Sequence, residues 1–212
     1  MTKKIIAVDL DGTLLNNESK LSDFTKETIK KISEKGHHVI ITTGRPYRMA
    51  KDFYRELELH TPMINFNGSL THLPGQAWAH EKCLTLDKKY LLDMVKRTED
   101  IQADFIAGEY RKKFYITTPN EEIADPKLFG VENFRPENQF KPERVTKDPN
   151  CILLQTRAED KYALANEMNR FYQHQLAINT WGGPLNILEC TPKGVNKAFA
   201  LEYLLNVMNR DK

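Results

Sequence analysis

Two aspartates near the start of the chain carry the clearest chemical signal. Asp9 and Asp11 are two positions apart, with Leu10 between them, and follow the apolar run that begins at Ile5. A run of this kind predicts a buried strand. In a parallel α/β sheet, reactive groups gather just beyond the carboxyl ends of the strands. Two carboxylates that leave a strand at Gly12 can face one pocket, where the first acts as nucleophile and the second as acid or base.

Aspartates with this spacing also occur in solvated loops and at the start of calcium-binding loops. A calcium loop places glycine at its sixth position and glutamate at its twelfth. Counting from Asp9, Gly12 falls at the fourth position and Lys20 at the twelfth. The spacing therefore excludes a calcium loop, and the preceding strand favours a reactive site over a plain solvated loop.

The elements that position these residues alternate between strand and helix over the first third of the chain. Ser22 is typical of a helix N-cap, and Gly36 is typical of a helix end. The sequence predicts strands at 5–10, 38–43 and 62–67, with helices at 22–36 and 46–59. This order, with short links, predicts an α/β fold in which a parallel sheet carries helices on its faces.

The middle of the chain follows a different pattern. Turn signals at Asn67-Gly68 and Pro74-Gly75 predict a hairpin at 65–83. Beyond it we expect helices at 86–98 and 160–172 and strands at 103–107, 114–118, 151–155, 176–180 and 185–190. We therefore assign 82–188 to a mixed α/β domain inserted into a core formed by 1–81 and 189–212, which ends in a helix at 194–209.

The composition argues against several classes of protein. A net charge of +2 is too balanced for a nucleic-acid binder, whose basic residues cluster on one face. No apolar run approaches the ~18 residues of a membrane span, and the first one is too short for a signal peptide. The 3 cysteines have no CxxC spacing, so a disulfide framework is not expected. We expect a cytoplasmic protein that binds neither nucleic acid nor a membrane.

Four short segments resemble signatures of the haloacid dehalogenase superfamily. Residues 9–15, Asp-Leu-Asp-Gly-Thr-Leu-Leu, resemble the first signature, and residues 40–46, Ile-Ile-Thr-Thr-Gly-Arg-Pro, resemble the second in its Cof-type, subfamily IIB form. Residues 65–69 are similar to the family's Asn-Gly-Ala stretch, with Ser69 in place of alanine, and residues 192–197 are similar to the third signature. The resemblance covers nearly the whole chain and implies a Rossmann-like core with an inserted α/β cap.

The resemblance also implies roles for individual residues. Asp9 would attack phosphorus and form an aspartyl-phosphate, while Asp11 would protonate the leaving oxygen and then activate water. Thr43 would donate a hydrogen bond to a phosphoryl oxygen. Lys197 would neutralise charge between Asp9 and the phosphate, although a solvated helix lysine is the common alternative. Lys193 is a weaker candidate for the same role.

The resemblance assigns substrate contacts to residues that flank these groups, namely Leu10, Gly12, Gly44, Arg45, Asn67 and Gly68. Backbone N–H groups around Asp11 and Gly12 can cradle an anion. Two of the assignments have a second interpretation. Arg45 is equally suited to pairing with a core acid, and Asn67-Gly68 is also a plain turn.

The family's acidic fourth signature, of the Gly-Asp-x-x-Asn-Asp type, does not follow Lys197. Magnesium is the cofactor that the resemblance implies, with Asp9 and Asp11 as its protein ligands. With the usual third carboxylate missing, we expect weak magnesium binding and low or no turnover for these 212 residues. In the family's sheet the strand beside the Asp9 strand would also be missing, which leaves an unpaired edge.

A magnesium titration in an aryl-phosphate hydrolysis assay measures this expectation. We predict turnover that stays low and does not saturate at ordinary magnesium concentrations. Robust, magnesium-saturable turnover by the 212-residue chain would refute it.

The sequence leaves three rivals to a phosphatase that hydrolyses a small phosphomonoester, such as a sugar phosphate or nucleotide. The first is a non-catalytic or regulatory protein that keeps the phosphate pocket. The second is a truncated form of a longer enzyme. The third is a phosphomutase, because the same signatures support phosphoryl transfer to a sugar. Binding of a phosphate analogue without turnover would favour the first, and a longer reading frame would favour the second.

Overall fold

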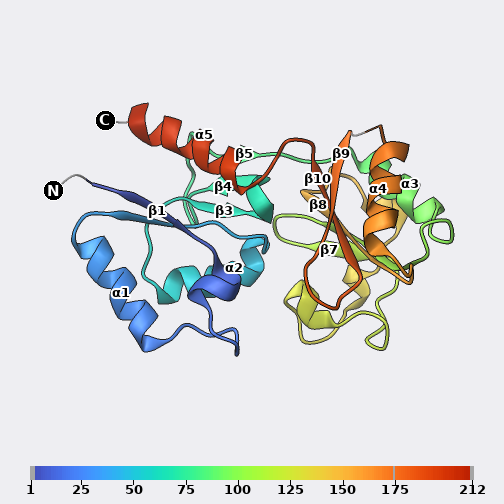
Figure 1. Cartoon of the computed structure of the whole chain (residues 1–212), viewed down its shortest axis with the longest axis horizontal. Coiled ribbons are helices and arrows are strands. Elements are labelled where there is room, and N and C mark those ends of the chain that lie inside the picture. Colours follow the sequence, from blue (N-terminus) through green and yellow to red (C-terminus); the bar gives the residue numbers. More distant parts are fainter. Residues whose placement is uncertain (1–2, 174, 211–212) are drawn as a thin grey trace. The chain divides into compact units, whose positions relative to one another are not determined.

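The computed structural model describes residues 3–173 and 175–210, and the chain divides into two compact units (Figure 1). Unit 1 runs to Cys83 and resumes at Val195, and unit 2 is Leu84–Gly194. The sequence predicted that the chain crosses from unit 1 into unit 2 at residue 82 and crosses back after residue 188. The second crossing comes later because strand β10, Ile187–Pro192, pairs along its length with strands of unit 2.

Unit 1 contains a parallel pair that is followed by an antiparallel hairpin. Strands β1, Ile5–Val8, and β2, His38–Ile41, pair in parallel with Val8 opposite Ile41. A parallel bridge from Thr42 to Ile64 continues the order to β3, Met63–Asn65. Strands β4, Leu70–His72, and β5, Lys82–Cys83, then add antiparallel. The predicted parallel pairing is therefore present between β1 and β2, and the hairpin expected at 65–83 belongs to a three-stranded antiparallel sheet that the Thr42–Ile64 bridge joins to them.

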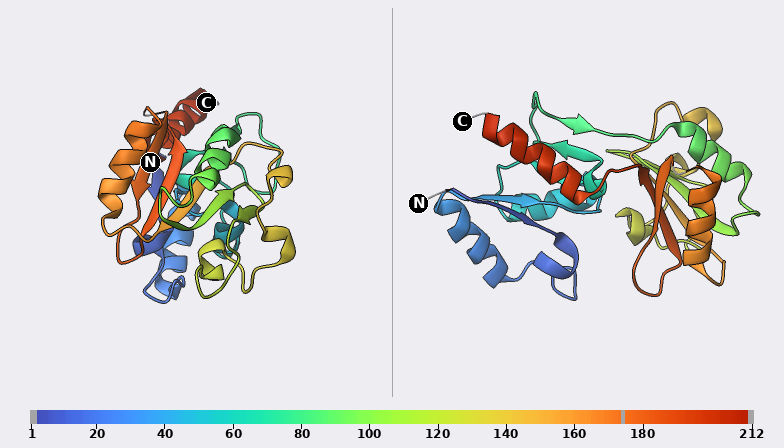
Figure 2. Two further views of the ribbon diagram at one scale, coloured as in Figure 1. Left: turned by 90° about the vertical axis from the view of Figure 1, so that its right-hand side faces the viewer. Right: turned by 45° about the horizontal axis from the view of Figure 1, so that its top comes forward.

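Helices cover both faces of the layer that the strands of unit 1 form (Figure 2, right). Helix α1, Asp23–Glu34, and helix α2, Tyr47–Glu56, pack with Val39, Ile41 and Met63. Helix α5, Lys197–Arg210, packs on the opposite face against Ile40 and Ile64. The predicted cap of α1 is present, since Ser22 Oγ accepts the N–H of Thr25 at 3.1 Å. Within the described residues, no helix has the length and apolar character needed to cross a bilayer.

Unit 2 is a five-stranded antiparallel sheet with helices α3, Lys88–Lys96, and α4, Lys161–Phe171, on one hydrophobic cluster. The strand order is β7-β6-β8-β10-β9. The remaining strands are β6, Ala103–Glu109, β7, Phe114–Ile116, β8, Cys151–Thr156, and β9, Leu176–Thr180. The weakly periodic segment 119–148 forms short 3-10 turns that each begin with proline, at Pro126–Phe129, Pro136–Asn138 and Pro142–Arg144.

A buried lysine fixes the connection between β9 and β10. The Lys161 Nζ donates to the carbonyl oxygens of Trp181, Gly183 and Leu185 at 2.9, 3.0 and 2.8 Å. Charged donors form stronger hydrogen bonds than neutral ones, so one ammonium group holds three successive points of the turn. The segment between β9 and β10 is therefore anchored from α4.

Gly68 lets the hairpin approach the start of α5. It lies in a short 3-10 turn, Phe66–Gly68, with a φ of +114°. A Cβ at this position would lie 2.3 Å from the backbone oxygen of Asn196 and 3.3 Å from the Ala200 Cβ. Asn196 caps α5, because its Oδ1 accepts the N–H of Phe199 at 2.9 Å. The position of α5 therefore requires a residue without a side chain at position 68.

We expect Gly68→Ala to lower the free energy of unfolding by on the order of 3 kcal/mol, because it combines an unfavourable φ with a clash against backbone. Gly75→Ala is the matched control, since Gly75 also has a positive φ, +77°, but a methyl group added there would meet no atom within 4 Å. The control should lose only about 1 kcal/mol. Urea unfolding measures both, and equal losses would show that backbone strain alone explains Gly68.

Candidate functional site

Asp9 directly follows β1 and is held by its own backbone. Its Oδ1 accepts the N–H of Leu10 at 2.8 Å. The side chains of Leu10 and Leu14 are buried, and the N–H of Leu15 donates to the oxygen of Leu10 at 2.9 Å. This tight turn anchors the loop in the core, so the Asp9 carboxylate is fixed at the carboxyl end of the strand.

Lys197 meets Asp9 although 188 positions separate them in the sequence. Its Nζ lies 2.5 Å from the Asp9 Oδ2, and the two side chains are 38% and 33% exposed. A pair with this exposure contributes at most about 1 kcal/mol to stability, because solvent screens it. The pair is therefore a consequence of the position of α5 and not its cause. It places a positive charge beside the candidate nucleophile.

Arg45 holds both oxygens of Asp11. Its Nε donates to Oδ2 at 2.9 Å and its Nη2 donates to Oδ1 at 2.6 Å. The guanidinium also lies 5.5 Å from the centre of the Phe53 ring. Of the two interpretations that the sequence allowed for Arg45, the structure shows the pairing with a core acid. Asp11 is the more exposed of the two aspartates, at 55%.

The turn after β2 is built around buried Thr43. Its N–H donates to the oxygen of Ile64 at 2.9 Å, and its oxygen accepts the N–H of Asn67 at 3.1 Å. Its Oγ1 accepts the N–H of Arg45 at 3.1 Å. At Gly44, a Cβ would lie 3.0 Å from the Asn67 Nδ2. The side chain of Asn67 thus packs against the glycine, and a larger residue there would displace it.

Two buried residues that the sequence did not single out support this turn. Asn65 Nδ2 donates to the oxygen of Arg45 at 2.9 Å, and Asn65 Oδ1 pairs with His72 Nε2 at 2.9 Å. The His72 ring meets the edge of Tyr47 at 4.9 Å between centroids. In the sequence, only their polar character on the two strands of the predicted hairpin could have pointed to these two residues. Their contacts link the hairpin to the backbone of Arg45.

A hollow of about 210 Å³ lies beside the ion pair, between β1, the end of β2 and α5. It is lined by Ala7, Val8, Asp9, Thr42, Lys197, Ala198 and Leu201. The Thr42 hydroxyl is buried and has no hydrogen-bond partner among the described residues. Thr42 is thus both a lining residue of this hollow and the carrier of a buried hydroxyl that is unbonded within the described residues.

The remaining predicted residues have different surroundings. Gly12 is exposed, with a φ of +68° and open space around it, which leaves its backbone accessible. Leu10 is fully buried, its N–H is bonded to the Asp9 Oδ1, and its oxygen is bonded to the N–H of Leu15. Gly68 packs against Asn196 and therefore positions α5. The structure thus groups Asp9 with Lys197 and Asp11 with Arg45. Thr43 lies on the turn after β2, and its oxygen accepts the N–H of Asn67 from the turn after β3.

The buried cysteines are poor nucleophiles. Burial, with added repulsion from Glu189, raises the pKa of the Cys151 and Cys190 thiols well above the usual value. A thiol in this state has little thiolate at neutral pH. Nucleophilic chemistry is therefore more plausible at Asp9 than at either buried sulfur.

Known proteins are similar to this chain over nearly its whole length. The family model for haloacid dehalogenase-like hydrolases matches residues 6–212. The 5-amino-6-(5-phospho-D-ribitylamino)uracil phosphatase YcsE of Bacillus subtilis is 41% identical over 198 residues, which cover 93% of this chain and 69% of that protein. YitU, a phosphatase of the same name from the same organism, is 30% identical over 205 residues, covering 94% of this chain and 73% of its own.

Solved structures share the fold at lower sequence identity. The crystal structure of TM0651 from Thermotoga maritima has a TM-score of 0.77 at 23% identity, and the match covers 99% of this chain and 76% of that one. The family match, the two phosphatases and this fold agree with the signatures found around Asp9 and Thr43. The chain therefore belongs to the haloacid dehalogenase-like hydrolases, as a phosphatase of their Cof-type branch.

Proposed function

We propose that the site at Asp9 hydrolyses a small phosphomonoester through an aspartyl-phosphate intermediate. The observation that carries the proposal is the Asp9–Lys197 pair, with 2.5 Å between Nζ and Oδ2, at the carboxyl end of β1. A carboxylate held beside a fixed cation can attack an anionic phosphate that it would otherwise repel.

The reaction takes place in two steps at Asp9. A carboxylate oxygen of Asp9 bonds to phosphorus, and the bond from phosphorus to the ester oxygen breaks. Asp11 gives its proton to the departing alkoxide. Water then attacks the same phosphorus and loses a proton to Asp11, which releases inorganic phosphate and restores Asp9. Because Arg45 holds both oxygens of Asp11, at least one of these hydrogen bonds must open before the proton moves.

The charges at the site explain the need for more than one cation. Each pair of like charges at ~4 Å costs about 4 kcal/mol at an effective dielectric constant near 20. A phosphate monoester carries up to two negative charges, and Lys197 offsets about one such pair. The donor set at the end of β1 suits magnesium, because the Asp9 carboxylate and the Asp11 carbonyl are hard oxygen ligands. Magnesium would supply the remaining positive charge at the phosphoryl oxygens.

The proposed metal site has few protein ligands. Within the described residues, no group of three or more His, Cys, Asp or Glu side chains is placed to hold a metal ion. Phosphate and water would then complete the octahedral shell that magnesium requires.

The substrate proposal combines the site with the named relatives. YcsE and YitU are named for a phosphate on a ribityl chain attached to a uracil. We propose a phosphorylated sugar, sugar alcohol or nucleotide as the substrate class, with that ribitylaminouracil phosphate as the first compound to test. Unit 2 is proposed to act as the cap that selects among such compounds and excludes water during the reaction.

Asp9→Asn should abolish the phosphoenzyme. Incubation of the unsubstituted chain with acetyl phosphate and magnesium should add one phosphoryl group to Asp9, which intact-mass and peptide mass spectrometry detect. The variant cannot form the acyl phosphate, so no adduct should appear. An adduct that persists in Asp9→Asn would identify another nucleophile. Phosphate-analogue binding with no adduct in the unsubstituted chain would favour a non-catalytic phosphate-binding protein.

Lys197→Met should lower the rate of phosphoryl transfer by roughly 10²–10³-fold, as expected for loss of one preorganised donor at the transition state. The pair is partly exposed, so thermal stability should change little. Lys193→Met is the matched control, because it removes a lysine that is close in sequence but does not contact Asp9, and it should keep the full rate. The same loss in both variants would contradict the role assigned to Lys197.

A further inference from the structure

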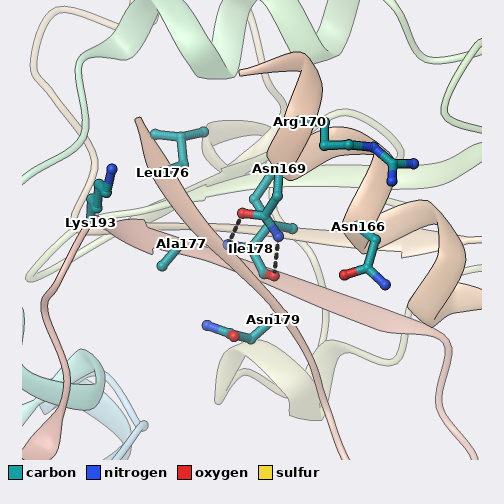
Figure 3. Close-up of a pocket in the computed structure, with 8 residues that line it drawn as sticks. All are labelled: Asn166, Asn169, Arg170, Leu176, Ala177, Ile178, Asn179 and Lys193. Carbon is teal, nitrogen blue, oxygen red and sulfur yellow. Dashed lines mark hydrogen bonds between the residues drawn. The ribbon is translucent and has the colours of Figure 1, made fainter. Parts of the chain in front are cut away.

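A second hollow, of about 580 Å³, lies within unit 2 between α4 and β9 (Figure 3). We call it the α4–β9 hollow. Its lining residues come from the second half of α4, from β9 and from the end of β10. They are Asn166, Asn169, Arg170, Leu176, Ala177, Ile178, Asn179 and Lys193. The volume is within the range of about 300–1,000 Å³ typical of small-molecule sites.

The wall of the hollow is rigid because Asn169 ties α4 to β9. Its Nδ2 donates to the oxygen of Ile178 at 2.8 Å, and its Oδ1 accepts the N–H of Ile178 at 3.1 Å (Figure 3). The same Nδ2 also donates to the oxygen of Ala165 at 2.9 Å. Strand β9 is at the edge of the sheet, and Asn169 satisfies the polar groups of Ile178 that another strand would need. The edge is therefore poorly suited to strand addition.

The two cationic side chains at the hollow have no acidic partner among the described residues. The side chains of Arg170 and Lys193 are exposed, and within the described residues neither forms an ion pair or a hydrogen bond. No aspartate or glutamate is among the described residues that line the hollow. A ligand here would meet positive charge without a competing carboxylate.

Figure 3 shows how the cations flank the strand. Lys193 and Arg170 lie on either side of the segment Leu176–Ile178, and Asn166 lies on the same side as Arg170. Leu176 and Ile178 are almost fully buried and contribute to an apolar floor. The amides of Asn166 and Asn179, neither of which is bonded to a described residue, can donate to or accept from hydroxyl groups.

We propose that the α4–β9 hollow binds a small molecule that carries more than one phosphate group on a neutral polar body. Arginine binds phosphate through paired N–H donors, and lysine adds a point charge. Two cations on either side of β9 suit two phosphate groups better than one. The apolar floor suits a ring, and the free amides suit its hydroxyls or ring nitrogens. This binding site is separate from the one proposed at Asp9.

Lys193 has a clear place in this assignment. In the sequence it was a second candidate for the role of Lys197, since both belong to the segment 192–197. In the structure Lys197 pairs with Asp9, whereas Lys193 lines the α4–β9 hollow directly after β10 ends at Pro192. The two lysines therefore serve different sites.

The test uses adenosine 5′-diphosphate as the probe and adenosine as its uncharged counterpart. Asp9→Asn protein, labelled with ¹⁵N, prevents turnover during the titration. We expect the diphosphate to shift the side-chain signals of Asn166, Asn179 and Arg170, and adenosine to shift them far less. The double variant Arg170→Gln/Lys193→Gln should weaken diphosphate binding by at least about 10-fold, because two charge-assisted contacts are lost.

Two matched variants separate this site from its alternatives. Lys127→Gln/Lys147→Gln removes the same charge at exposed positions of unit 2 outside the hollow, and binding should stay within about two-fold of the parent. Adding Lys197→Met perturbs the Asp9 site and should leave the shifts at the hollow unchanged. Thermal melting confirms that each variant folds like the parent, as expected for exposed side chains.

Three results would overturn the proposal. Signals that shift only around Asp9 would place the probe at the proposed active site. Equal weakening in both double variants would show attraction to net charge alone. Equal shifts with adenosine and with the diphosphate would remove the role of phosphate. None of these results bears on phosphoenzyme formation at Asp9, so the two proposals can fail independently.

Discussion

The contact between Asp9 and Lys197 depends on how closely the hairpin after β3 approaches the last helix. The ion pair itself is too exposed to hold α5 in place. Packing holds it instead, since Ala200 and Leu204 lie in one buried cluster with Ile40 and Ile64. Gly68 allows this approach because it has no side chain to meet the oxygen of Asn196. Apolar packing and one glycine thus determine where the charge lies, and the charge then defines the site.

The two aspartates are restrained by cations from different parts of unit 1. Asp9 is paired from α5, whereas Asp11 is paired by Arg45 from the turn after β2. Buried Asn65 holds this turn through the backbone oxygen of Arg45, and Asn65 also pairs with His72 on the next strand. Buried polar groups are costly unless all of them are bonded, so this chain of contacts favours one conformation of the turn. The surroundings of the two acids therefore differ, which suits the different roles proposed for them.

Local patterns in the sequence predict the elements better than the contacts between them. The cap at Ser22, the strand before Asp9 and the helix that carries Lys197 all follow from residue types at fixed spacing. The pairing of Asn65 with His72 does not, because it requires the register of the hairpin. The contacts of Lys161 could not be predicted either, because the three carbonyls that it holds lie 20 or more positions further along the chain. A lysine near the start of a helix is usually solvated. The hydroxyl of Thr42 is also indistinguishable in sequence from any strand threonine.

The two proposed anion sites differ in what an incoming phosphate must displace. At Asp9, each nearby cation is already matched by a carboxylate, so a phosphate must share Lys197 and loosen the hold of Arg45 on Asp11. Binding there is tied to rearrangement of the groups that carry out the chemistry, which favours the transition state over simple retention of the substrate. At the α4–β9 hollow, Arg170 and Lys193 have no carboxylate among the lining residues to give up. A phosphate can bind there without rearrangement, which is the behaviour of a site that retains its ligand unchanged.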